Sequence, residues 1–87
     1  MIYLITYDLR VPGRDYTSLY NAIKEYGDWQ HPVESTWFIS SDQQANDIYD
    51  HLFPFIDKND RILVIQVNQI NKQGWLAKSF WDWFNSK

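Results

Sequence analysis

Two runs of β-branched and aromatic residues, Ile2–Tyr7 and Arg61–Val67, lie near opposite ends of an 87-residue chain. Each run predicts a buried strand, because residues of this kind are enriched in strands and neither run contains a turn signal. A chain of this length forms one domain around one core, so residues 1–87 are expected to fold together. The two runs therefore anchor one sheet, and the segments between them decide its topology.

Two segments with apolar residues at helical spacing separate these runs. In the first, Asp15 is the expected cap and Gly27 ends the helix. In the second, Ser41 or Asp42 is the expected cap and Pro54 ends the helix. The apolar stripes of the two helices are Tyr16, Leu19, Tyr20, Ile23 and Tyr26, followed by Ala45, Ile48, Tyr49 and Leu52.

Thr36–Ser40 predicts a further strand between the two helices, and Asp28–Val33 predicts a weaker partner that bends at Pro32. Asp57–Asp60 is expected to be a polar turn before the last strand. The resulting order, β-α-β-β-α-β, predicts an α+β domain of the ferredoxin-like type. In that arrangement two helices cover one face of an antiparallel sheet.

The residues after the last strand predict an aromatic, helix-like tail from Gln73 to Lys87. Its apolar residues recur at helical spacing and are Leu76, Phe80, Trp83 and Phe84. The second face of the sheet needs cover, and the candidates are this tail or a second copy of the chain. A bare sheet face in a chain with 18% aromatic residues would be an association site.

The charge balance narrows the classes of partner. Eight basic and 11 acidic residues give a net charge of −3. Nucleic-acid binders usually carry a basic surplus, so a nucleic-acid partner is only weakly supported. The absence of cysteine excludes disulfides, cysteine-bound zinc and thiol catalysis. No apolar run approaches a membrane span of about 20 residues, so we expect a soluble, cytoplasmic protein without a membrane partner.

Asp8 is the residue that most suggests chemistry. It follows the first apolar strand, where a carboxylate is held at a fixed place beside loops. One interpretation is a metal or proton site, and the other is an Asp that accepts hydrogen bonds from loop amides between Arg10 and Gly13. A single carboxylate is a poor magnesium site, but a two-fold dimer would bring two copies of it to one axis.

Several short motifs resemble one known superfamily. The opening Ile2–Leu9, the helix that ends in Tyr26-Gly27 and the stretch Glu34–Ile39 resemble the superfamily of the small CRISPR-associated protein two and the VapD-type toxins. The Ser35-Thr36-Trp37 step and the pattern from Asp60 to Val64 are most similar to its short bacterial members labelled SinR family. This resemblance covers nearly the whole chain.

The resemblance implies a ferredoxin-like homodimer. In the CRISPR branch, an aspartate that ends the first strand is proposed to bind a divalent metal for phosphodiester hydrolysis, and Asp8 matches it. Ser35 matches a serine of the family's Gln-x-Ser-Val-Phe step, although Val33 stands where that Gln would be. Other members of the superfamily are non-catalytic adaptors that bridge DNA-integrating partners.

Two hypotheses about function follow. In the first, the chain is a magnesium-dependent nuclease in which paired Asp8 carboxylates hold the ion, with Arg10, Arg14 and Ser35 as substrate-binding residues. In the second, it is a non-catalytic dimeric adaptor or interaction module, and Asp8 fixes a loop. Surface charge distinguishes them, because a nuclease needs positive potential around Asp8 and an adaptor does not.

Overall fold

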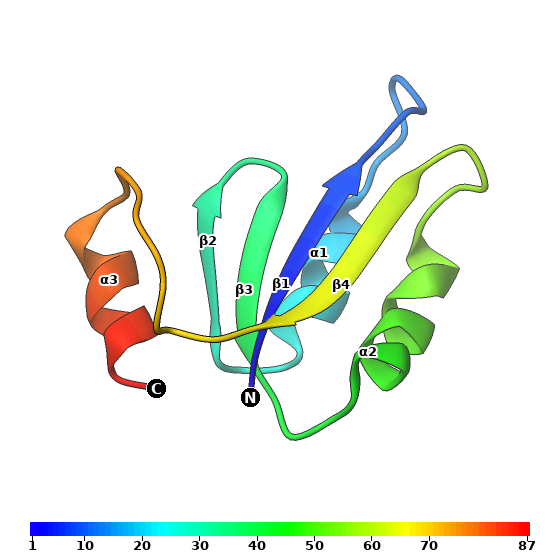
Figure 1. Ribbon diagram of the computed structural model, residues 1–87. Coiled ribbons are helices and arrows are strands. Elements are labelled where there is room, and N and C mark those ends of the chain that lie inside the picture. The colour runs from blue at the N-terminus through cyan, green and yellow to red at the C-terminus, as the bar shows by residue number, and fades with distance from the viewer.

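A four-stranded antiparallel sheet in the order β2-β3-β1-β4 forms the centre of the computed structural model, which describes residues 1–87 (Figure 1). The elements are β1 (Ile2–Asp8), α1 (Thr17–Lys24), β2 (Trp29–Val33), β3 (Thr36–Ser40), α2 (Ala45–Leu52), the 3₁₀ turn η1 (Phe53–Phe55), β4 (Arg61–Val67) and α3 (Lys78–Asn85). Sheet and helices together confirm the predicted α+β class.

The main core lies between the sheet and the helices α1 and α2. Alternation along β1 points Tyr3 and Ile5 toward these helices, and β3 adds Trp37 and Ile39 beside them. The helices contribute the buried side chains of Leu19, Ala22, Ile23, Ile48 and Leu52. Both helices therefore cover the same face of the sheet, as the order of the elements in the sequence predicts.

The tail helix α3 packs on the opposite face of the sheet. Its buried residues Phe80 and Phe84 contact Ile2 and the ring of Phe38. The predicted tail therefore covers part of this face: Figure 1 shows α3 beside β2, and Val67, the last residue of β4, packs against the same cluster.

Asp28 fastens the C-terminal end of the tail. The ammonium of Lys87 and the Trp83 indole N–H, which lies 2.6 Å from the carboxylate, both donate to Asp28. The hydrogen bond from Lys87, and after it the one from Trp83, holds the pKa of Asp28 below its usual value. At neutral pH the charged Asp28 carboxylate therefore anchors the end of α3.

Two expectations are corrected. The second helix begins at Ala45 after Gln44, because the Ser41 hydroxyl accepts a hydrogen bond from the Gln43 amide and turns the chain before the helix starts. Neither Ser41 nor Asp42 is thus the cap. The second correction concerns β4, which is an edge strand with no fully buried residue, whereas its apolar sequence predicts a buried strand.

Candidate functional site

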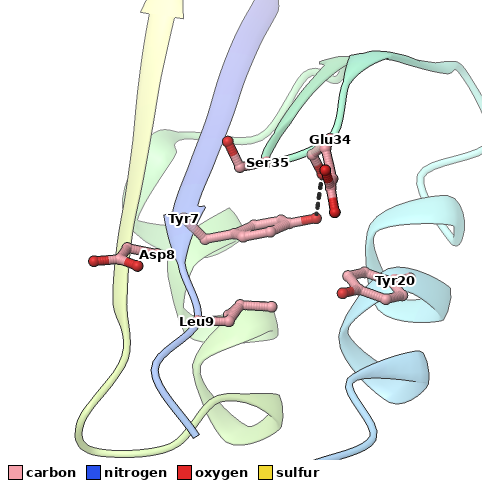
Figure 2. Close-up of a pocket in the computed structure, with 6 residues that line it drawn as sticks. All are labelled: Tyr7, Asp8, Leu9, Tyr20, Glu34 and Ser35. Carbon is pink, nitrogen blue, oxygen red and sulfur yellow. Dashed lines mark hydrogen bonds between the residues drawn. The ribbon is translucent and has the colours of Figure 1, made fainter. Parts of the chain in front are cut away.

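Asp8 lies at the end of β1, and its side chain leaves the sheet on the face opposite the main core. It pairs in register with Arg61 of β4, and the same face of the strand pair carries Thr6 opposite Leu63. Figure 2 shows the Asp8 carboxylate pointing away from the neighbouring Tyr7 ring. The Asp8 side chain is 60% exposed and is therefore open to an external partner.

Arg10 neutralises Asp8 in this chain. The Arg10 Nε atom donates to the Asp8 carboxylate at 2.7 Å, so the partner is a side chain and not the loop amides that one interpretation of the sequence predicts. Arg14 is directed elsewhere, because its guanidinium pairs with Asp57 at 3.3 Å. Of the two predicted phosphate contacts, only Arg10 therefore lies against Asp8.

A cavity of about 450 Å³ joins Asp8 to the β2–β3 turn. The pairing of β1 with β3 brings Ser35 there, and the Ser35 carbonyl accepts a hydrogen bond from the Tyr7 amide at 3.1 Å. Asp8 and Ser35 thus line one cavity, although the Asp8 carboxylate does not point into it. The lining residues are Tyr7, Asp8, Leu9, Tyr20, Glu34 and Ser35.

Tyr7 is the polar centre of this cavity, and it is absent from the sequence-based candidates. Its hydroxyl accepts a hydrogen bond from the Trp37 indole at 3.0 Å and donates one to the Glu34 carbonyl at 3.1 Å. Burial raises the pKa of Tyr7, so the phenol stays protonated at neutral pH. The sequence does contain a signal for Tyr7: consecutive residues of a strand point to opposite faces, so Tyr7 had to lie on the helix side of the sheet if Asp8 lies on the other side.

Asp60 holds the loop that carries Arg10. This carboxylate, 6% exposed, accepts hydrogen bonds from the backbone amides of Arg10 and Asp57 and from the Tyr16 hydroxyl. The polar turn expected at Asp57–Asp60 is present, but its buried role is not readable from the sequence. These hydrogen bonds form a clamp that fixes the backbone at Arg10, the residue whose guanidinium pairs with Asp8.

One protomer does not supply a magnesium site. Magnesium in proteins normally takes one or two carboxylates together with waters and substrate phosphates. At the end of β1, Asp8 is the one carboxylate on the face opposite the main core, and it is already paired with Arg10. No group of three or more His, Cys, Asp or Glu side chains is placed to hold a metal ion. Within a single chain, the residues therefore do not fit the metal that the resemblance implies.

The same face of the sheet carries an uncovered apolar strip, defined here as Leu4, Leu63 and Ile65. Leu63 and Ile65 are 52% and 48% exposed, and Ile65 pairs in register with Leu4. The tail helix α3 packs at β2, at Phe38 of β3 and at the Ile2–Val67 end of the β1–β4 pair, and the three residues of the strip lie outside this cluster. Asp8 lies at one end of the strip, two residues beyond Thr6.

No protein-family model matches this chain, and no solved structure matches it. No helix is long and apolar enough to cross a membrane.

Proposed function

We propose that this protein is a homodimeric, non-catalytic interaction module with a ferredoxin-like fold. The strand order β2-β3-β1-β4, with α1 and α2 on one face, supports that fold. The motifs around Asp8 and Ser35 support membership in the superfamily of CRISPR-associated protein two and the VapD-type toxins, on the branch labelled SinR family. In this proposal, Asp8 serves to position the loop after β1 through Arg10.

The uncovered strip carries the proposal of a dimer. A small protein gains little by exposing large aliphatic side chains side by side, and such patches are typical of association surfaces. Leu4, Leu63 and Ile65 stand on two adjacent strands and are flanked by the polar Thr6 and by the Asp8–Arg61 pair. An apolar centre with a polar rim is the usual composition of an interface, and a two-fold dimer would place each strip against its copy.

Charge supports a non-catalytic role. Around Asp8 the cationic groups are Arg10, which is paired, and Arg61, which lies opposite in the sheet. Glu34 lines the adjoining cavity, and Arg14 is occupied by Asp57. A phosphodiester substrate would need an excess of positive charge at this place. The arrangement is close to neutral and therefore favours a protein partner.

We expect Ile65→Lys to weaken dimerisation by at least about 100-fold, because a charge buried in an apolar interface without a partner is strongly unfavourable. Val33→Lys is the matched control, since Val33 is a strand residue with a similar exposure of 46% but lies away from the strip. Sedimentation velocity over a concentration series measures the dimerisation of the two variants. Equal association by the two variants would contradict a dimer formed through the strip.

A magnesium-dependent nuclease is the second candidate, and one observation favours it. The exposed Asp8 carboxylate lies on the same face as the uncovered strip, so a two-fold axis near Thr6 and Leu63 would bring two Asp8 side chains toward each other. Magnesium, when bound there, would activate a water and neutralise a scissile phosphate. This candidate requires that magnesium tighten the dimer and that Asp8→Asn remove the effect.

A further inference from the structure

Two aromatic rings from different elements line the cavity at the end of β1. Tyr7 belongs to β1 and Tyr20 to α1, and their ring centroids lie 6.2 Å apart at an interplanar angle of 34°. Figure 2 shows the Leu9 side chain beside the Tyr7 ring, on the side away from Ser35. The cavity therefore offers ring surface and aliphatic surface to a ligand.

Both rings are held in place by contacts within the protein. The Tyr7 hydroxyl accepts a hydrogen bond from the Trp37 indole and donates one to the Glu34 carbonyl. The Tyr20 ring stacks on that of Trp37, with the centroids 6.2 Å apart. Rings that are already fixed lose little conformational freedom when a ligand binds. Because the Tyr7 hydroxyl has its partners, a ligand gains most here from ring surface and from charge.

The uncompensated charge of the cavity belongs to Glu34. No Lys, Arg or His lines the cavity, and Glu34 forms no ion pair. Asp8, the other acidic residue of the lining, points away and is paired with Arg10. Figure 2 shows Glu34 above the space between Tyr7 and Tyr20. Burial is the largest cause of the raised pKa of Tyr7, and the Glu34 charge adds to it, as expected for a carboxylate near the phenol.

We propose that this cavity binds a small organic cation whose nitrogen carries methyl groups, such as a trimethylammonium compound. A cation is attracted by an aromatic ring within about 6 Å of the ring centroid, and rings at this separation allow it to contact both. Glu34 supplies the opposite charge. Methyl groups pack on Leu9 and the rings, and they need no hydrogen-bond acceptor, unlike the N–H groups of Lys or Arg.

The size of the cavity agrees with a ligand of this kind. Its volume of about 450 Å³ lies within the usual range of small-molecule sites, about 300–1,000 Å³. The inference goes beyond the proposed interaction role and does not depend on a dimer, because all the lining residues come from one chain.

Choline is the probe, added at constant ionic strength while the ring resonances of Tyr7 and Tyr20 are followed by NMR. We expect a Kd on the order of 1 mM. The neutral carbon analogue of choline, in which a quaternary carbon replaces the nitrogen, should bind at least about tenfold more weakly, because it loses the attraction to Glu34 and to both rings. Ethanolamine keeps the charge without the methyl groups and should bind at least about fivefold more weakly, because its ammonium is strongly hydrated.

Glu34→Gln should weaken choline binding at least about fivefold, because it removes the charge and keeps the backbone carbonyl that holds Tyr7. Asp50→Asn, which removes an exposed carboxylate on α2, is the matched control and should leave binding unchanged. Tyr20→Leu should weaken binding at least about threefold through loss of one ring. Its control is Tyr49→Leu, because Tyr49 is a half-exposed tyrosine on α2 that does not line the cavity.

Thermal unfolding shows whether Tyr20→Leu folds, and the exposed Glu34 provides a test that leaves the core intact. Three results would each overturn the proposal. They are unchanged Tyr7 and Tyr20 resonances on addition of choline, equal affinity for choline and either of its two analogues, and full affinity in Glu34→Gln.

Discussion

Deletion of Gly74–Lys87 should lower the free energy of unfolding by about 5 kcal/mol or more, since loss of a single buried Phe costs about 3–5 kcal/mol. The segment contains Phe80 and Phe84, which are 3% and 4% exposed and cover Ile2. The deletion also removes both donors to Asp28. Small domains have a total stability of about 5–15 kcal/mol, so thermal unfolding followed by circular dichroism should show a truncated chain that is largely unfolded.

Trp75→Ala provides the matched control within the same segment. Trp75 is 100% exposed, so its replacement should change the free energy of unfolding by less than about 0.5 kcal/mol. A truncated chain that melts at the temperature of the full chain would show instead that α3 adds nothing to the fold.

Asp60→Ala should lower the free energy of unfolding by about 3 kcal/mol, because three buried or half-buried donors lose a charged acceptor. The donors are the amides of Arg10 and Asp57 and the Tyr16 hydroxyl, and they come from segments up to 50 residues apart. Urea unfolding measures the effect. Asp50→Ala, which removes an exposed carboxylate without an ion-pair partner, should change stability by less than about 0.5 kcal/mol.

The contribution of Asp60 should also depend on pH. Burial acts to raise the pKa of Asp60, but the hydrogen bonds from Arg10, Asp57 and Tyr16 outweigh it and hold the pKa below its usual value. A lowered pKa in the folded state means that the stabilisation is complete above the unfolded value of about 3.9 and is lost as the pH falls through the folded value. The difference between wild type and Asp60→Asn should therefore shrink in acid. A difference that stays constant down to pH values below the folded pKa would contradict the clamp.

Local sequence signals predicted the elements of this fold well, because each is carried by neighbouring residues. Thr36–Ser40 is a strand with the predicted bounds, and Gly27 follows α1 with a φ of +81°, the left-handed conformation that suits glycine. The position of β4 was not predictable in this way. A continuous apolar run is equally typical of a central strand and of an edge strand whose exposed face awaits a partner.

The candidate site was predictable only in part, for the same reason. Arg10 lies two residues from Asp8, so their contact is local, whereas Ser35 reaches the site through the register of β1 with β3. Arg14 pairs with Asp57, which is 43 residues away in the chain, and no local sequence pattern predicts this pairing. The clamp at Asp60 likewise depends on tertiary contacts, which sequence spacing does not encode.

Sedimentation equilibrium with and without millimolar magnesium tests the central claim most directly. At about 10–100 μM protein, the proposed homodimer predicts twice the single-chain mass of 10.5 kDa, unchanged by magnesium and unchanged in Asp8→Asn. A mass of one chain throughout this range would contradict the homodimer. A dimer that forms only with magnesium and is lost in Asp8→Asn would contradict the non-catalytic role and favour a metal site shared by two Asp8 carboxylates.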